Sequence, residues 1–412
     1  MPEAKSPLFN RTYLKIVVWI VAIAIVLLTA GQNKDPDFIH IKKLPEVPLY
    51  YVSQEKAPYL QLHFLLRTGA AINSDQQLLQ QLLLQQIEQQ LTELTTRQLF
   101  RQLNVKLKTE AAADRITLLV TLPATQSEAR DSIREIAETL LQQLNIYQPD
   151  PGLEQRWAHL EAEQYLNLKD PENHLLNRFS NQISGPVSVH PLQRFADFYR
   201  SSTAPGAITL TLRGPDAGLL AETLAPLLRG NRTPSIIPSV ALAPAPLRLE
   251  PVGNQAYQLW GIALPGRQQE NFAAELLAVR TLRQLLLQQD QFTARLVWKS
   301  LDKQGYLAMI LHGPQIHANT DLPQTMEKLQ AQLSDELIDN TRAALQKSFQ
   351  TQMEQTGNQL NMLDTVAFYQ QPTDYLERFE KSLSQADNAI IRQRINGFLS
   401  DPGHYQLILP AY

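Results

Sequence analysis

The segment from 75 to 91, DQQLLQQLLLQQIEQQL, places leucines at helical spacing, and all of its polar positions are glutamine except Asp75 and Glu88. Apolar residues three and four positions apart predict an amphipathic helix. A glutamine amide cannot take a proton from water at neutral pH, and it is a weak ligand for zinc. The helix is therefore predicted to be a scaffold with an uncharged polar face, which either lies in solvent or packs against a partner or a peptide.

Other catalytic and metal-binding patterns are missing from the sequence. No two of the eight histidines are three or four positions apart, as ligands on one helical turn would be. The chain has no cysteine, which excludes thiolate zinc sites, iron–sulfur clusters and cysteine nucleophiles. It also lacks the glycine-rich motifs of serine hydrolases, P-loops and dinucleotide sites. The net charge of -3, with scattered basic residues, argues against nucleic-acid binding.

The elements around the glutamine helix follow a pattern that occurs twice. The β-rich runs PLYYVSQ and YLQLHFLLRTGA flank EKAP and predict an antiparallel hairpin before the helix. Later, YQLWGIALPG precedes a second helix, NFAAELLAVRTLRQLLLQQ. The segments beginning LTTRQLFRQLNV and QFTARLVWKS are each predicted to run from an arginine-bearing helix into a strand. The sequence thus predicts two copies of an α+β module of about 200 residues, each a mostly antiparallel or mixed sheet with helices on one side.

The N-terminus predicts a membrane anchor. Lys15 and Lys34 enclose 18 uncharged residues, a length at the short end of a spanning helix, and further cations precede them. A cleavable signal peptide and a buried core helix with a polar leader are the alternatives. The predicted divisions are a cytoplasmic leader (1–13), a transmembrane anchor (14–30), a tether (31–47), an N-terminal module (48–229), a proline-rich linker (230–246) and a C-terminal module (247–412). The cations predict a bacterial inner-membrane protein whose bulk lies in the periplasm.

The arrangement resembles the insulinase, pitrilysin and mitochondrial-processing-peptidase family of zinc peptidases. The resemblance rests on RTGAAINSDQQLLQQLLLQQ, DFYRSSTAPGAITLTLRGP and FTARLVWKSLDKQGYLA, and it runs in order from residue 48 to 410. It implies that each module is half of a peptidase clamshell. In the family, the first long helix carries the zinc motif H-x-x-E-H. Counted from the hairpin glycine, the positions of the two histidines and the glutamate hold Leu82, Gln86 and Gln85, so this helix is predicted to bind no zinc.

Two further sets of residues follow from the resemblance. His159, Glu161 and Glu163 lie near the place of the family's late glutamate ligand, and they are interpreted as helix-surface residues. Arg295 matches an arginine that, in two-part members of the family, belongs to the half without zinc and holds the substrate; a surface ion pair is the alternative. The matching tyrosine position holds Ala308, and Tyr306 lies two residues earlier, as either a displaced substrate contact or a packing residue.

These observations favour an inactive zinc-peptidase homologue, anchored in the membrane, that pairs with a zinc-bearing relative to bind and process peptides or envelope proteins. The chain itself is then not an enzyme, and zinc is expected only in the partner subunit. One alternative is a non-proteolytic binding or scaffold protein of the envelope. Another is a metalloendopeptidase that uses His159 with Glu161 or Glu163 as ligands.

Overall fold

The computed structural model describes residues 38–412 except 149–150, 185–189, 231–245, 268–270 and 401–402, and Ile39–Tyr412 forms one compact unit. The predicted leader and membrane anchor, and nearly all of the predicted linker, lie outside the described residues. Within the described part of the chain, no helix is long and apolar enough to cross a membrane.

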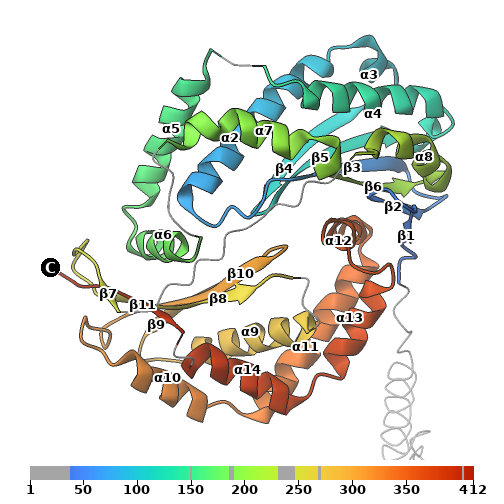
Figure 1. Ribbon diagram of the computed structural model, residues 1–412. Helices are drawn as coiled ribbons and strands as arrows, with labels where there is room; N and C mark the ends of the chain where they lie inside the picture. Colours follow the sequence, from blue (N-terminus) through green and yellow to red (C-terminus); the bar gives the residue numbers. More distant parts are fainter. Residues whose placement is uncertain (1–37, 149–150, 185–189, 231–245, 268–270, 401–402) are drawn as a thin grey trace, which may run out of the picture. The chain divides into compact units, whose positions relative to one another are not determined.

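The first sheet is mixed and has six strands (Figure 1). The strands are β1 (Lys42–Lys43), β2 (Leu49–Ser53), β3 (Tyr59–Arg67), β4 (Lys106–Ala112), β5 (Arg115–Pro123) and β6 (Ile208–Gly214). Their order is β1-β2-β6-β3-β5-β4, and only β2 and β6 run parallel. The predicted hairpin is wrong, because β6 lies between β2 and β3. Every residue of β6 is buried, so this strand requires a neighbour on both sides and takes an inner position.

The helices of the first half begin with the predicted glutamine helix. They are α2 (Ser74–Leu94), α3 (Gln98–Gln102), α4 (Arg130–Asn145), α5 (Leu153–Asn167), α6 (Pro171–Ser184), α7 (Phe195–Thr203) and α8 (Ala217–Leu224). At the start of α2, the Asn73 side chain accepts a hydrogen bond from the Gln76 backbone, and the Gln76 side chain accepts one from the Asn73 backbone. This reciprocal capping box satisfies two backbone N–H groups that the first turn leaves unpaired.

The second sheet has five strands. They are β7 (Leu247–Arg248), β8 (Tyr257–Pro265), β9 (Thr293–Ser300), β10 (Gln304–His312) and β11 (Tyr405–Leu409), in the order β7-β11-β8-β10-β9. The predicted helix at the start of the QFTARLVWKS segment is wrong, because residues 293–300 form the edge strand β9. Period-two alternation and the residues Val297 and Trp298 suit a pleated strand better than a helix. Arg295 therefore lies on a strand.

Six helices complete the second half. They are α9 (Phe272–Leu287), α10 (Leu322–Ala331), α11 (Asp335–Glu354), α12 (Thr356–Phe368), α13 (Tyr375–Ser384) and α14 (Asn388–Ser400). The strand orders β6-β3-β5-β4 and β11-β8-β10-β9 correspond, and both runs are antiparallel throughout. The predicted internal repeat is therefore present in the chain path.

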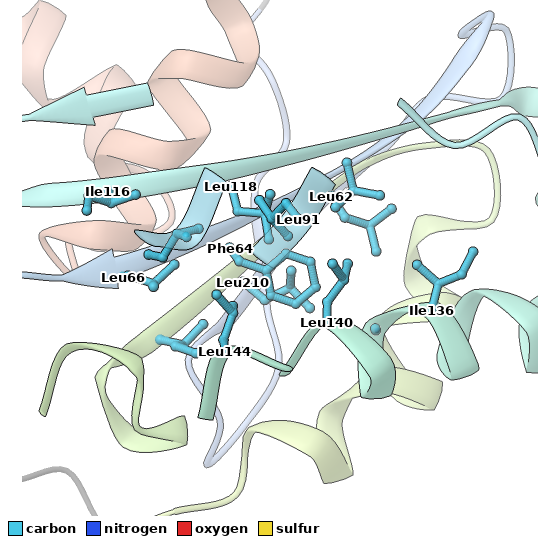
Figure 2. Close-up of a cluster of buried hydrophobic side chains, with 14 of the residues drawn as sticks. Leu62, Phe64, Leu66, Leu91, Ile116, Leu118, Ile136, Leu140, Leu144 and Leu210 are labelled. Atoms are coloured by element: carbon cyan, nitrogen blue, oxygen red, sulfur yellow. The ribbon is translucent and has the colours of Figure 1, made fainter. Parts of the chain in front are cut away.

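The core of the first half lies between its sheet and its own helices (Figure 2). Alternate residues of β3 point toward these helices, and they meet buried side chains of α2 and α4. The cluster includes Leu62, Phe64, Leu66, Leu91, Ile116, Leu118, Ile136, Leu140, Leu144 and Leu210. Full burial of one such side chain contributes about 1.5–3 kcal/mol. This cluster therefore holds α2 and α4 against the sheet.

Each sheet is also covered on its other face by a helix of the opposite half. Helix α6 packs on β8, β10 and β11, where Leu175 and Phe179 share a buried cluster with Leu259 and Leu407. Helix α12 packs on β2, β3 and β6. The expectation of helices on one side is therefore incomplete, because the sequence pattern of one half does not contain the helix that the other half supplies.

Candidate functional site

The three positions that would carry zinc chemistry in the family lie on helix α2. Leu82 is fully buried in the core of the first half. The Gln85 side-chain oxygen is buried and has no hydrogen-bond partner among the described residues. Gln86 is 4% exposed. None of these groups is an imidazole or a carboxylate, so these three positions present no donor set for zinc and no base for a bound water.

Helix α5 places an arginine against these glutamines. Arg156 donates from Nη2 to Oε1 of Gln86 at 2.8 Å and from Nη1 to Oε1 of Gln89 at 3.0 Å. A guanidinium is permanently charged and repels a second cation at this distance. The two helices that would share a metal are thus joined by a side-chain cation, and the residues present do not fit zinc. The sequence prediction missed Arg156, although it lies one helical turn before His159.

The late-ligand candidates His159, Glu161 and Glu163 are exposed residues of α5. His159 Nε2 and Glu163 Oε1 are 3.1 Å apart, and both side chains are mostly exposed. Within the described chain, no group of three or more histidine, aspartate or glutamate side chains is arranged to hold a metal ion. The alternative with non-standard zinc ligands therefore has no site among these residues.

The glutamines of α2 are more buried than a solvated face would be. Gln80, Gln86 and Gln90 are each at most 7% exposed. Gln80 donates to the Ala112 carbonyl at 2.7 Å, and Gln90 accepts from the Tyr199 hydroxyl at 2.8 Å. Part of the polar face therefore ties the helix to β4 and α7 within the chain, which neither sequence interpretation anticipated.

A cavity of about 440 Å³ lies beside α2, between α5, α6 and strands β9 and β10. Both predicted contact residues, Arg295 and Tyr306, line it. The lining also includes six carboxamide side chains: Gln77, Gln81, Gln164, Asn167, Asn173 and Asn177. A cavity of this size is in the range of ligand-binding pockets. The structure thus places Arg295 and Tyr306 of the second half in one cavity with carboxamide side chains of the first half.

Arg295 is engaged in an ion pair. Its Nη1 donates to Oε2 of Glu172 on α6 at 2.8 Å and lies 3.4 Å from Oδ1 of Asn173. The arginine side chain is 45% exposed, which leaves part of the guanidinium accessible from the cavity. The ion pair and a peptide contact are therefore compatible, and the role in substrate or partner binding stays a prediction.

Tyr306 is 3% exposed. Its ring packs edge-on against Phe179 of α6, with centroids 5.5 Å apart. Burial raises the pKa of Tyr306 to about 12, and the charge of Arg295 acts in the opposite direction. The residue holds α6 on the second sheet and lines the inner wall of the cavity; its contact with a substrate also stays a prediction.

Comparisons with known proteins identify the fold. No family model and no curated protein matches the sequence. The inactive domain of an M16 peptidase from Pseudomonas fluorescens is 13% identical, with 91% of this chain and 98% of that chain covered and a TM-score of 0.67. A chain of complex III2 from Candida albicans is 12% identical, with 90% and 96% covered and a TM-score of 0.60.

A third similar structure is the first half of the periplasmic protease PqqL from Escherichia coli. It is 13% identical, and the match covers 91% of this chain and 92% of that chain with a TM-score of 0.58. The predicted insulinase-type fold is therefore confirmed: the chain folds as peptidase M16 domains do.

Proposed function

We propose that this chain is the non-catalytic, membrane-anchored subunit of an extracytoplasmic peptidase, in which a zinc-bearing relative supplies the metal. The observation that carries the proposal is the contrast between two sites. The zinc positions hold Leu82, Gln85 and Gln86, and Arg156 lies against them. The neighbouring cavity is polar and contains Arg295.

The division of work follows from the residues of each site. Zinc-dependent hydrolysis of a peptide bond requires ligands that hold the metal and a base for the attacking water, and Leu82, Gln85 and Gln86 supply neither. A cavity lined by carboxamides can still hold an extended peptide, since each carboxamide offers both a donor and an acceptor. This chain would therefore position a peptide, and its partner would cut it.

The structural comparisons support a partnered role. Two of the similar structures are an inactive M16 domain and a chain within complex III2, and a third is half of a longer protease. The uncharged segment between Lys15 and Lys34 supports the anchor, and the cations before it support a periplasmic location for the bulk of the chain.

A second candidate function is a binding or scaffold protein that works without a peptidase. The observation that favours it is that the cavity offers six carboxamides and Arg295 as binding groups, while the zinc-motif positions hold no metal ligand. Such a protein would bind its peptide or envelope protein alone.

Purification of the full-length chain from its native membrane in mild detergent, followed by mass spectrometry and a zinc assay, separates these functions. Recovery of a relative that contains H-x-x-E-H, with zinc near one ion per complex, supports the proposed function. Recovery of a zinc-free chain alone contradicts it and favours the binding protein. As a control, residues 1–47 fused to an unrelated soluble domain should not recover the relative.

A further inference from the structure

Lys299 is the one basic side chain of the amide-lined cavity for which the described structure records no hydrogen bond or ion pair. It lies on the edge strand β9, opposite Tyr306 of β10, and its side chain lines the cavity. The other charged residues of the lining are paired: Arg295 with Glu172, and Glu163 with His159. Within the described lining, Lys299 is therefore the cation with no recorded acceptor, and the one carboxylate of the lining, Glu163, is mostly exposed and lies beside His159.

The surroundings of Lys299 make this charge costly. The residue is only partly exposed, and burial lowers its pKa. An ammonium group that has lost water without gaining an acceptor is unfavourable, and a carboxylate brought within about 4 Å restores the lost interaction. The free cavity thus favours a ligand that carries a negative charge.

The carboxamides show what else the ligand must offer. Gln164 and Asn177 are half-buried in the lining, and the structure records no hydrogen bond for either side chain among the residues it describes. A carboxamide has donors and an acceptor and so complements the N–H and C=O groups of a peptide backbone. Gln164 comes from α5, Asn177 from α6 and Lys299 from β9, so three different elements bring these groups to one cavity.

We propose that this cavity binds an acidic segment of a peptide, with an aspartate or glutamate carboxylate on Lys299 and the backbone on the carboxamides. The inference rests on the proposed function in one respect, that the ligand is a peptide. It adds the class of segment that is selected and the residue that selects it. An edge strand beside the cavity leaves backbone groups of β9 unpaired on one side, which suits an extended ligand.

Binding of two short fluorescent peptides to the full-length chain in detergent tests the proposal. The peptides have blocked ends and differ only at one central residue, glutamate in one and glutamine in the other. Because a hydrogen bond to a charged group contributes about 1.5–3 kcal/mol, wild-type protein should prefer the glutamate peptide by roughly tenfold or more. Lys299→Met should bind both peptides equally, with the affinity for the glutamine peptide unchanged.

Two further variants make the result specific. Lys299→Arg should keep a preference for glutamate, because it keeps the charge. Lys108→Met removes an exposed lysine of β4 that pairs with Glu110, and it should behave as wild type. A preference that survives in Lys299→Met, or equal binding of both peptides by wild type, would overturn the proposal.

A measurement on the wild-type chain guards against variants that misfold. Acetylation by acetic anhydride, mapped by mass spectrometry, should show Lys299 protected by the glutamate peptide and much less by the glutamine peptide, while Lys108 reacts equally in both. Equal labelling of Lys299 with and without the glutamate peptide contradicts the inference. If the purification recovers a zinc-bearing relative but wild type binds both peptides equally, only the inference about acidic peptides is overturned. If wild type prefers the glutamate peptide but no relative is recovered, only the proposed pairing is overturned.

Discussion

His63 Nδ1 and Asp364 Oδ2 lie 2.7 Å apart in the buried contact between the two halves, although 301 positions separate them in the sequence. Asp364 also accepts a hydrogen bond from the Thr211 hydroxyl at 2.5 Å. One carboxylate of helix α12 thus joins strands β3 and β6 of the first sheet. It replaces the water that these polar side chains would lose when α12 covers them.

Asp364→Asn should destabilise the chain by about 2–3 kcal/mol, because it removes the buried negative charge beside His63 and Thr211 and replaces one of the two acceptor oxygens by an NH2 donor. Urea unfolding followed by circular dichroism measures the change. Glu110→Gln, at an exposed ion pair of β4, is the matched control and should shift the free energy of unfolding by less than about 0.5 kcal/mol. Equal effects of the two substitutions would show that the buried contact is unimportant.

Arg156→Met should weaken the contact between α5 and α2, since it removes both hydrogen bonds to Gln86 and Gln89 and keeps the apolar stem. The buried Gln86 oxygen would be left without this donor, and the expected loss is about 1–3 kcal/mol of unfolding free energy. Arg134→Met, which breaks an exposed pair with Glu138 on α4, is the control. An unchanged urea midpoint in Arg156→Met would argue against the guanidinium as the link between the helices.

Gly261→Ala should destabilise the packing of α6 on the second sheet. A Cβ at this position would lie 2.7 Å from the Phe179 ring, and overpacking of this kind costs about 1–3 kcal/mol. Gly397→Ala provides a control of opposite sign: it lies in α14 with nothing within 4 Å of its new Cβ, and should stabilise by about 0.5–1 kcal/mol. Thermal melts compare them, and Phe179→Leu should partly relieve the Gly261→Ala defect. A defect that the leucine leaves unchanged would place the strain elsewhere.

Alkaline pH should lower stability through buried tyrosines. Burial raises the pKa of Tyr199, Tyr306 and Tyr369 to about 12. In the unfolded chain they release their protons near pH 10, whereas the folded chain retains them. Their contribution is therefore complete below about pH 10 and is lost as the pH rises toward 12, because the folded state then binds more protons than the unfolded state.

Tyr306→Phe should reduce that alkaline loss, since one of the buried tyrosines no longer titrates. Urea unfolding at several pH values between 8 and 12 gives the slope. Tyr412→Phe, whose ring is 84% exposed, should leave the slope unchanged. An identical slope in wild type and Tyr306→Phe would mean that this hydroxyl does not carry the effect.

Under the proposed function, Arg295→Ala should reduce peptide cleavage by the complex that the chain forms with a zinc-bearing relative. Loss of a charged hydrogen bond to substrate predicts roughly a tenfold or larger decrease in kcat/KM. Arg134→Ala is the control for loss of a surface arginine. Full activity of Arg295→Ala, in a complex that assembles normally, would leave Arg295 with the Glu172 ion pair as its only role.

Local patterns predicted those parts of the fold that depend on neighbouring residues. Helix α2 follows from the spacing of its leucines, and the repeat follows from the same order of strand and helix patterns in both halves. The contacts of His63 with Asp364 and of Arg156 with Gln86 join residues far apart in the sequence, and no periodicity predicts such pairs. The β2–β3 hairpin was wrong for the same reason, since β6 enters the sheet from about 150 residues later.

The sequence contains a pattern that could have identified Lys299 as a neighbour of Arg295. Arg295, Val297 and Lys299 alternate, so a strand at this point would have put both cations on one face. Because a helix was predicted at the start of this segment, Arg295 and Lys299 were not assigned to one face of a strand. Contact of Arg295 and Tyr306 with a substrate depends on where a separate peptide binds, and the periodicity of this chain carries no information on that position.

Helix α6 of the first half covers the second sheet, and α12 of the second half covers the first sheet. The two sheets therefore receive these helices at different times during synthesis. The sheet of the first half is complete once β6 has left the ribosome, yet the helix that covers its other face ends at Phe368. Until then, His63 and Thr211 face water on a sheet whose apolar neighbours also lack a cover. The first sheet therefore stays uncovered on this face until more than a hundred further residues have been made. We expect a chaperone to bind the exposed apolar surface during that interval.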